Sequence, residues 1–229
     1  MTGNITQSAP ISVTGTSSFT AHDDVVLDQA NTFTQVVAVD AVNVTLNAAS
    51  ALTLDTSTVT GDLTLTTAVG DITQTGPIAV TGKSTLTTTA GNVMLTDVAN
   101  TFGDVVDAQT SGGLSLTATG PLTMGKVTVQ GNADLKSTGV LNLGAGSYAG
   151  KLKANSGGSD MLQSGPIKFS GDVDFDAGSA KIDLFNPNNL WTGILTFKGG
   201  IIMINHPVLM NAVSAGTLVV RVETTVVDR

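Results

Sequence analysis

Three aspartates at alternate positions are the residues of this chain whose spacing points most directly to chemistry. Asp172, Asp174 and Asp176 are separated by Val173 and Phe175. On a β-strand the three carboxylates would project from one face, about 6–7 Å apart. Such a row could bind Ca²⁺ weakly or supply the acids of a polysaccharide hydrolase. We favour the alternative of a solvated strand face above a buried Val/Phe pair, because the Gly-Gly-x-Gly-x-Asp motif of calcium solenoids is absent.

The other reactive side chains do not form a recognisable site. His22 and His206 are the two histidines, and neither lies in a motif with the spacing of metal ligands. The chain has no cysteine, which excludes disulfides, thiolate metal sites and a cysteine nucleophile. No Ser/His/Asp arrangement, phosphate-binding loop or dinucleotide motif occurs. We therefore expect no catalytic residue, no metal site and no cofactor.

The charge of the chain argues against a nucleic-acid partner, and its short apolar stretches argue against membrane insertion. The net charge is −8, and no Lys or Arg precedes Lys83, whereas seven Asp do. A nucleic acid would need a basic patch, so we do not expect it as a partner. No stretch approaches the roughly 20 apolar residues of a membrane helix, so we do not expect membrane insertion. The first residues also lack the basic and apolar regions of a signal peptide.

The chain repeats itself. The segment Gly-Asn-Ile-Thr-Gln at residues 3–7 returns as Gly-Asp-Ile-Thr-Gln at residues 70–74, which is 67 residues later. A third and more diverged copy starts at Gln163. Repetition of this kind is typical of solenoids and repeat arrays, in which one backbone path recurs. We place the units at about residues 3–69, 70–162 and 163–192, within a repeat region of residues 1–192.

Two kinds of residue recur in every copy. A proline precedes an Ile early in each unit, and an aromatic side chain comes two residues after an Asn later in it. These structural repeat anchors are Pro10, Pro77 and Pro166, and Phe33, Phe102 and Trp191. We expect the three aromatic side chains to occupy the same angular position in the fold and to point inward.

Apolar residues alternate with Thr, Ser, Asn and Asp over very short runs, as in residues 44–46 and 63–65. A period of two is the mark of strands with one buried face. The first unit contains about nine such segments, each bounded by Gly, Asn, Asp or Ser. No window has a helical period. The sequence therefore predicts an all-β chain.

Two architectures would accommodate many short strands, namely tandem β-sandwiches and a parallel β-helix. Sandwich strands are usually longer and enclose a few fixed large core residues. Nine segments divide naturally into three coils of three strands, about 22 residues per coil. We therefore predict a right-handed parallel β-helix (solenoid) of about ten coils. Thr-rich segments such as residues 85–87 are similar to ice-binding arrays, but their spacing along the sequence is irregular.

Two segments depart from the repeat pattern. Residues 143–160 are Gly-rich and hold the single Tyr, which predicts an added coil or a protruding loop. Residues 193–229 are expected to form a C-terminal β-rich cap or an assembly segment. Within it, the residues expected to pair with another chain are Leu218, Val220 and Val222. Pairing of this end with the first coil of a second copy would build open filaments, and frayed ends are the alternative.

Some of these motifs point to a family. The pattern Ile-Thr-Gln (72–74), Pro-Ile (77–78), Val-Thr-Gly (80–82) and Asn-Thr-Phe (100–102), with the run 52–61, resembles the repeats of filamentous-haemagglutinin-like bacterial exoproteins of the two-partner secretion and autotransporter types. The likeness covers roughly residues 3–192. It implies a β-helical rod that crosses the outer membrane through a transporter and serves adhesion or a structural role.

A short string near the end also resembles that family. Asn-Pro-Asn-Asn at residues 186–189 is similar to a signature of its secretion domain, but it lacks the usual next residue and is interpreted as a turn. The chain starts within a repeat, so we expect it to be an excerpt of a longer protein, with a complete cytoplasmic protein as the alternative.

The sequence thus predicts a non-catalytic structural or adhesive segment of a secreted or surface-displayed exoprotein. Its partner would be an unidentified protein or glycan of a host or cell surface. One alternative is a subunit of a self-assembling extracellular filament. A second alternative is a carbohydrate-active β-helix enzyme, which would need carboxylates that converge from adjacent coils beside a cation or an aromatic ring.

Overall fold

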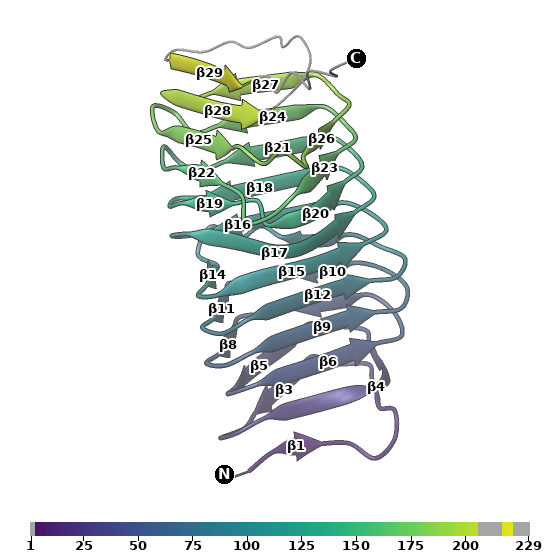
Figure 1. Ribbon diagram of the computed structural model, residues 1–229. Helices are drawn as coiled ribbons and strands as arrows, with labels where there is room; N and C mark the ends of the chain where they lie inside the picture. The colour runs from purple at the N-terminus through teal and green to yellow at the C-terminus, as the bar shows by residue number, and fades with distance from the viewer. Residues whose placement is uncertain (1–2, 206–216, 222–229) are drawn as a thin grey trace.

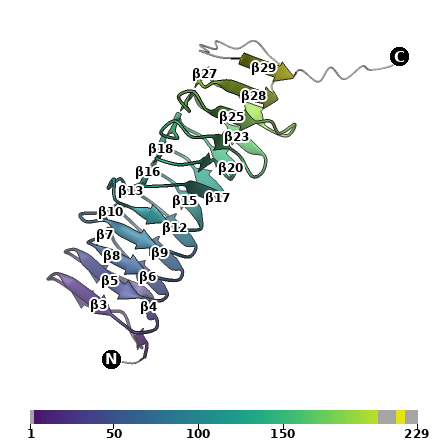
Figure 2. The same ribbon diagram turned by 90° about the vertical axis from the view of Figure 1, so that its left-hand side faces the viewer.

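The chain forms a parallel β-solenoid of about ten turns, as a computed structural model that describes residues 3–205 and 217–221 shows. Short strands stack along one axis, with β1 near one end and β29 at the other (Figures 1 and 2). All strand pairs in the described part are parallel, and no helix there could span a membrane. The prediction of an all-β solenoid is confirmed.

The strands fall into two sheets. The 16-stranded sheet contains β1 (Ile5–Thr6), β2 (Ser12–Val13), β4 (Val25–Phe33), β6 (Val44–Ala48), β9 (Leu63–Thr67), β12 (Ser84–Thr88), β15 (Val105–Thr110), β17 (Leu122–Val129), β19 (Leu141–Asn142), β20 (Ala145–Tyr148), β22 (Met161–Leu162), β23 (Ile167–Phe169), β25 (Lys181–Leu184), β26 (Leu190–Trp191), β28 (Ile201–Asn205) and β29 (Thr217–Arg221). The 13-stranded sheet contains β3 (Ser17–Thr20), β5 (Val37–Ala41), β7 (Leu52–Leu54), β8 (Ser57–Val59), β10 (Ile72–Gln74), β11 (Ile78–Val80), β13 (Val93–Leu95), β14 (Thr101–Phe102), β16 (Leu114–Ala118), β18 (Ala133–Ser137), β21 (Leu152–Asn155), β24 (Val173–Asp176) and β27 (Leu195–Lys198). Nine of these strands, β1 to β9, lie within residues 5–67, as predicted.

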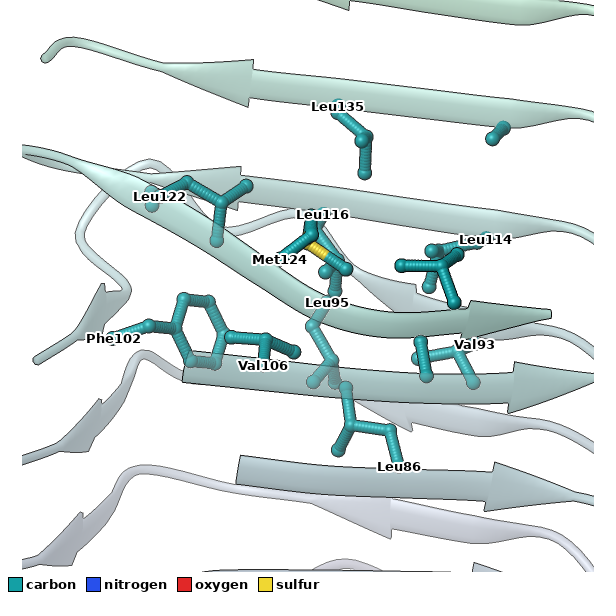
Figure 3. Close-up of a cluster of buried hydrophobic side chains, with 14 of the residues drawn as sticks. Leu86, Val93, Leu95, Phe102, Val106, Leu114, Leu116, Leu122, Met124 and Leu135 are labelled. Atoms are coloured by element: carbon teal, nitrogen blue, oxygen red, sulfur yellow. The ribbon is translucent and has the colours of Figure 1, made fainter. Parts of the chain in front are cut away.

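The apolar residues of the alternating pattern point into the solenoid, and the polar residues between them point outward. In β9 the side chains of Leu63 and Leu65 are buried, while Thr64 and Thr66 between them are partly exposed. Strand β12 repeats this pattern in register, so that Leu86 stacks on Leu65. Figure 3 shows how such inward side chains fill the interior from successive coils. Because each fully buried Leu or Val contributes about 1.5–3 kcal/mol, this continuous apolar column is the main stabilising element.

The coil is shorter than the sequence suggested. Ile5 pairs with Val25, twenty residues later, and Val44 pairs with Leu63, nineteen residues later. A coil therefore takes about 20 residues rather than 22. The 67-residue offset between the first two copies consequently spans three coils and about one third of a fourth, and this rotation leaves Ile5 in the 16-stranded sheet and its equivalent Ile72 in the 13-stranded sheet. The third copy starts 89 residues after the second, and Met161, the equivalent of Ile72, lies in the 16-stranded sheet again.

This rotation contradicts the expected common position of the three aromatic anchors. We define a column as the residues that lie in register on successive strands. Phe33 lies over Val13, and the column of Phe102 contains Val80, Val59 and Ala41. The column of Trp191 contains Phe169, Tyr148, Val129, Thr110, Thr88, Thr67, Ala48 and Asn31. The aromatics thus lie in three different columns.

The burial of the three aromatic side chains agrees better with the expectation that they point inward. Phe33 and Phe102 are buried, with 4% and 6% of their surface exposed. Trp191 is only partly buried against the core, where it stacks on Phe169 with a centroid distance of 4.2 Å. The anchors keep one local role, which is to cover the inward residue of the preceding coil.

The proline anchors do not belong to the core. Pro10 and Pro166 are exposed, and Pro77 is partly exposed. Pro77 and Pro166 directly precede β11 and β23, and Pro10 lies two residues before β2, so the missing N–H of proline costs no ladder hydrogen bond. The carbonyl of Pro77 still accepts a bond from Ser57 N at 3.0 Å. The prolines therefore shape a corner of the coil.

The atypical segments continue the solenoid. Residues 143–160 contribute β20 and β21, with Tyr148 buried and its hydroxyl donating to Leu143 O, so they form an added coil and not a protruding loop. Strands β27 and β28 extend the same sheets past residue 192. In β29, Leu218 and Val220 pair with Ile202 and Ile204. Val222 and His206 lie outside the described residues.

Glycines let adjacent coils approach closely at the corners. A Cβ at Gly82 would lie 2.6 Å from Gly61 O, and one at the repeat-equivalent Gly15 would meet nothing within 4 Å. We expect Gly82→Ala to lower the free energy of unfolding by about 1–3 kcal/mol, and Gly15→Ala to change it by less than about 0.5 kcal/mol. Chemical denaturation of both variants measures this. Equal losses would mean that coil contact does not explain these glycines.

A buried serine interrupts one inward column. Ser84 lies between Leu63 and Val106, is fully buried, and its hydroxyl has no hydrogen-bond partner within the described residues. We expect Ser84→Val to raise the free energy of unfolding by about 1–2 kcal/mol, because an unsatisfied hydroxyl is replaced by apolar volume.

Ser57 is the matched control for this prediction. It is also buried, but its hydroxyl donates to Asp55 O at 2.8 Å and accepts from Val39 N at 3.1 Å. Ser57→Val should therefore destabilise the fold. Thermal unfolding of both variants tests the difference in sign, and a loss of stability in Ser84→Val would contradict it.

Candidate functional site

The three alternating aspartates do not converge on one site. Asp172 lies just before β24, and its Oδ1 accepts from Ile194 N at 2.9 Å. Asp174 is partly exposed. Asp176 accepts from Gly178 N at 2.8 Å and pairs with Lys198 Nζ at 3.0 Å. Val173 and Phe175 are buried beneath them, which confirms the solvated strand face.

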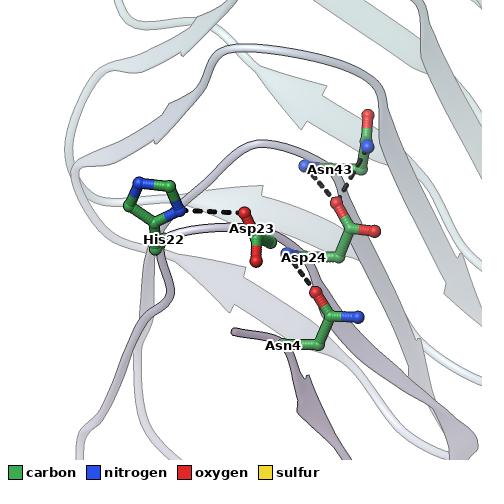
Figure 4. Close-up of polar contacts among 5 residues, drawn as sticks. All are labelled: Asn4, His22, Asp23, Asp24 and Asn43. Atoms are coloured by element: carbon green, nitrogen blue, oxygen red, sulfur yellow. Dashed lines mark hydrogen bonds and ion pairs between the residues drawn. The ribbon is translucent and has the colours of Figure 1, made fainter. Parts of the chain in front are cut away.

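No group of three or more His, Cys, Asp or Glu side chains with metal-binding geometry occurs in the part of the chain that the structure describes. His22 is exposed, and its Nδ1 lies 2.9 Å from Asp23 Oδ1 in the turn that precedes β4 (Figure 4).

Beside this turn, side-chain oxygens link successive coils. Asp24 N donates to Asn4 Oδ1 at 3.1 Å, and Asn43 N and Nδ2 donate to Asp24 Oδ1 at 3.2 and 2.8 Å (Figure 4). Each of these residues comes directly before a strand of the same sheet. The oxygen of one coil thus accepts from the backbone N–H at the equivalent position of the next coil.

The same contact recurs along the solenoid. The further Asp and Asn side chains that accept a backbone N–H of the next coil include Asn43, Asp62, Asp71, Asn92, Asp107, Asn132, Asp160 and Asp172. The bonds that the Asp carboxylates accept are charge-assisted, and such bonds are among the stronger ones. Several of the acidic residues therefore have a structural role, which accounts for part of the excess of Asp early in the chain.

A second polar motif occurs once in each repeat, and sequence reasoning missed it. Gln74 Nε2 donates to Asn100 Oδ1 at 2.9 Å, and Asn100 Nδ2 donates to Gln74 Oε1 at 2.8 Å. Asn100 Oδ1 also accepts from Ile78 N at 2.8 Å. Asn100 is fully buried. We call this arrangement the amide pair.

The other two copies form the same amide pair. Gln7 and Asn31 exchange bonds of 2.8 and 2.9 Å, and Gln163 and Asn189 exchange bonds of 3.0 and 2.7 Å. The separation is 24 residues in the first copy and 26 in the other two. A Gln and an Asn that recur in every copy at this separation were the sequence signal that could have predicted the amide pair. Asn189 ends the string 186–189, whose interpretation as a turn is confirmed.

Ion pairs link exposed faces of neighbouring coils. Asp107 Oδ2 lies 2.7 Å from Lys83 Nζ, and Asp107 Oδ1 accepts from Lys126 N at 2.7 Å. Burial raises the pKa of Asp107, but the bonds from Lys83 and Lys126 outweigh it and leave the pKa below its ordinary value. The bonds from Gly178 N and Lys198 likewise lower the pKa of Asp176.

These shifts fix the direction of a pH effect. A carboxyl with a lowered pKa in the folded state stabilises the fold above its ordinary pKa, and this contribution is lost as the pH falls through the folded value. The lysines of the two pairs, Lys83 and Lys198, are 46% and 62% exposed, so solvent screens both pairs and each contributes little at neutral pH.

The row of threonines on the outer face is more regular than the sequence suggested. Thr64 and Thr66 of β9 lie in register with Thr85 and Thr87 of β12. The array ends at β15, where the corresponding residues are Asp107 and Gln109. It therefore covers too few strands for the extended flat surface of an ice-binding solenoid, and it leads into the charged contacts around Asp107.

Comparison with known proteins agrees with the repeat architecture. A search of curated proteins and of solved structures finds no match to the chain. A family described as repeats of unknown function (DUF5649) matches residues 1–40, 41–109 and 133–198. These segments cover most of the solenoid and include all three amide pairs, and the chain accordingly belongs to this family of repeats.

Proposed function

We propose that the chain is a structural and adhesive rod segment of a bacterial exoprotein, displayed at the cell surface or released. The observation that carries this proposal is that polar side chains bond one coil to the next. The Asp and Asn ladders and the amide pairs are hydrogen-bonded between coils and make the backbone path uniform. The resemblance of the motifs to filamentous-haemagglutinin-like repeats supplies the export route through an outer-membrane transporter.

The proposed role is non-catalytic. A carbohydrate-active β-helix would need carboxylates that converge in one groove, and Asp172, Asp174 and Asp176 have separate environments instead. Incubation of the protein with soluble polysaccharides, followed by a reducing-end assay, should give no signal above buffer. Release of reducing ends would favour the enzyme alternative.

Adhesion can be tested directly. Fluorescent beads coated with the full chain should be retained on bacterial or epithelial cell layers more than beads coated with albumin. Retention equal to that of albumin on every layer would contradict the adhesive role. Export can be tested separately, by expression of the parent gene with and without an outer-membrane transporter of the two-partner secretion type; equal secretion in both cases would contradict this route.

A filament subunit is the second candidate function, and the first described coil favours it. Its inward side chains Ile5, Ile11, Val13 and Phe19 are only partly buried. Strands β1 and β3 have one paired edge each, with β4 and β5, and β29 pairs with β28. Open edges of this kind recruit further strands.

Light scattering over a concentration series tests self-association. The full chain should grow in mass with concentration, and a chain without residues 217–229 should not. A monomer in both cases at high concentration would overturn the filament proposal and leave the rod proposal intact.

A further inference from the structure

The outer face of β12, β15 and β17, which are neighbours in the 16-stranded sheet (Figure 1), is hollowed. One hollow of about 270 Å³ lies over Asp107 and Lys126, and a second of about 190 Å³ lies beside it. Both are lined by Thr87, Gln109 and Thr128, so they form one shallow groove. We call it the Asp107 groove.

A β-bulge forms this groove. Val106 pairs with Met124 and Ala108 with Val127, so β17 has one residue more than β15 at this point. Bulges are rare between parallel strands, and they redirect side chains near binding sites. Gly125 occupies the bulge because a Cβ there would lie 2.2 Å from Asp107 Oδ1. The irregularity is thus matched to the position of the Asp107 carboxylate.

The groove contains one lysine that is not paired with a carboxylate of the described residues. Asp107 is bonded to Lys83 Nζ through one oxygen and to the Lys126 backbone through the other. Its side chain is 19% exposed, so it is largely covered by these contacts. The Lys126 side chain lines the hollow and forms no ion pair within the described part of the chain. Lys83 lies outside this lining and is also close to Asp62 and Asp104, so among the described residues the Lys126 ammonium is the cation of the lining that no carboxylate pairs.

The remaining polar lining suits a ligand rich in hydroxyl groups. Thr87, Gln109 and Thr128 lie in register on three successive strands. Their hydroxyl and amide groups can both donate and accept hydrogen bonds. Two strand spacings of about 4.8 Å give a row about 10 Å long. A ligand with a dense negative charge fits less well, because the chain as a whole carries a net charge of −8.

We propose that the Asp107 groove binds a linear acidic glycan, with a uronate carboxylate on Lys126 and sugar hydroxyls along Thr87, Gln109 and Thr128. This inference rests on the proposed adhesive function and names the ligand class and the site. Lys83 is a positioning residue, because it holds the Asp107 carboxylate against the bulge. The neutral threonine array of β9 and β12 continues the row for a longer polymer.

Calorimetry with defined hexasaccharides tests the proposal. The probes are oligogalacturonate, oligomannuronate and hyaluronan, each with its methyl-esterified neutral counterpart. At least one uronate probe should bind the full chain more tightly than its ester. The affinity should fall as NaCl rises from about 0.05 to 0.5 M, because salt screens an exposed charge contact.

Three variants locate the site. Lys126→Gln should weaken binding about tenfold or more, as loss of a charge-assisted bond predicts. Thr87→Val with Thr128→Val should weaken it while keeping the side-chain shape. Lys153→Gln, on β21 of the other sheet, should bind as the wild type does. Absence of uronate binding, equal binding of the esters, or unchanged binding by Lys126→Gln would overturn the proposal.

The bead assay separates this proposal from the adhesive function. Beads that adhere to cells without any uronate binding would overturn the groove proposal and support adhesion through another surface. Uronate binding that Lys126→Gln abolishes, without adhesion to any cell layer, would support the groove and contradict the adhesive role.

Discussion

Phe102→Ala is expected to lower the free energy of unfolding by about 3–5 kcal/mol, which is the range for buried Phe-to-Ala changes. The ring is 94% covered, at 6% exposure, and belongs to the continuous apolar core. Figure 3 shows it among the inward side chains of neighbouring coils. A solenoid held by ladders above and below cannot collapse readily around the cavity, so the cost should lie at the upper end.

Thr87→Ala provides the comparison for this result. Thr87 is partly exposed on the outer face of β12, and its loss should cost less than about 0.5 kcal/mol. Urea unfolding followed by circular dichroism measures both variants. Similar losses at the two positions would mean that the assignment of inside and outside is wrong.

The inside and outside of the coils could be predicted because alternation is a local property. Leu63 and Leu65 flank Thr64 in the sequence, and a strand turns this order into two faces whatever lies around it. The number of strands in the first unit followed for the same reason. The added coil at residues 143–160 was one of two readings, and only its pairing with β17, β18 and β23 decides between them.

The angular position of equivalent residues around the solenoid axis could not be predicted from local sequence patterns. A sequence offset of 67 residues gives the length of path between equivalent residues, but the angular position depends on the length of a coil. An error of about two residues per coil accumulates over the more than four coils between Phe102 and Trp191 and places them in different columns. Coil length is fixed by the corners, where glycine contacts and Asp or Asn ladders set how tightly the chain turns.

The Asp107 groove was even harder to predict from the local sequence. Residues 122–129 contain one sign of the extra residue, because their apolar positions are 122, 124, 127 and 129 and a glycine stands at the interruption, but the sequence does not show which strand lies opposite. The bulge exists only relative to β15, because it is a mismatch between two strands. Lys83 and Asp107 are 24 positions apart and meet only because they lie on adjacent coils.

Asn100→Ala is expected to lower the free energy of unfolding by about 3 kcal/mol or more. The change removes both bonds to Gln74 and leaves the buried N–H of Ile78 without its acceptor. Each buried group left unsatisfied costs about 1–3 kcal/mol. Asn188→Ala, at an exposed turn position, should change the free energy by less than about 0.5 kcal/mol.

A double-mutant cycle isolates the amide pair. Gln74→Ala, Asn100→Ala and the double variant should show a coupling energy of about 0.5–3 kcal/mol, because the two side chains bond each other twice. Asn189→Ala should repeat the loss in the third copy, since Asn189 bonds Gln163 and Ile167 N in the same way. Additive losses for Gln74 and Asn100 would mean that the pair does not act as a unit. The recurring Gln and Asn would then need an explanation other than their mutual bonds.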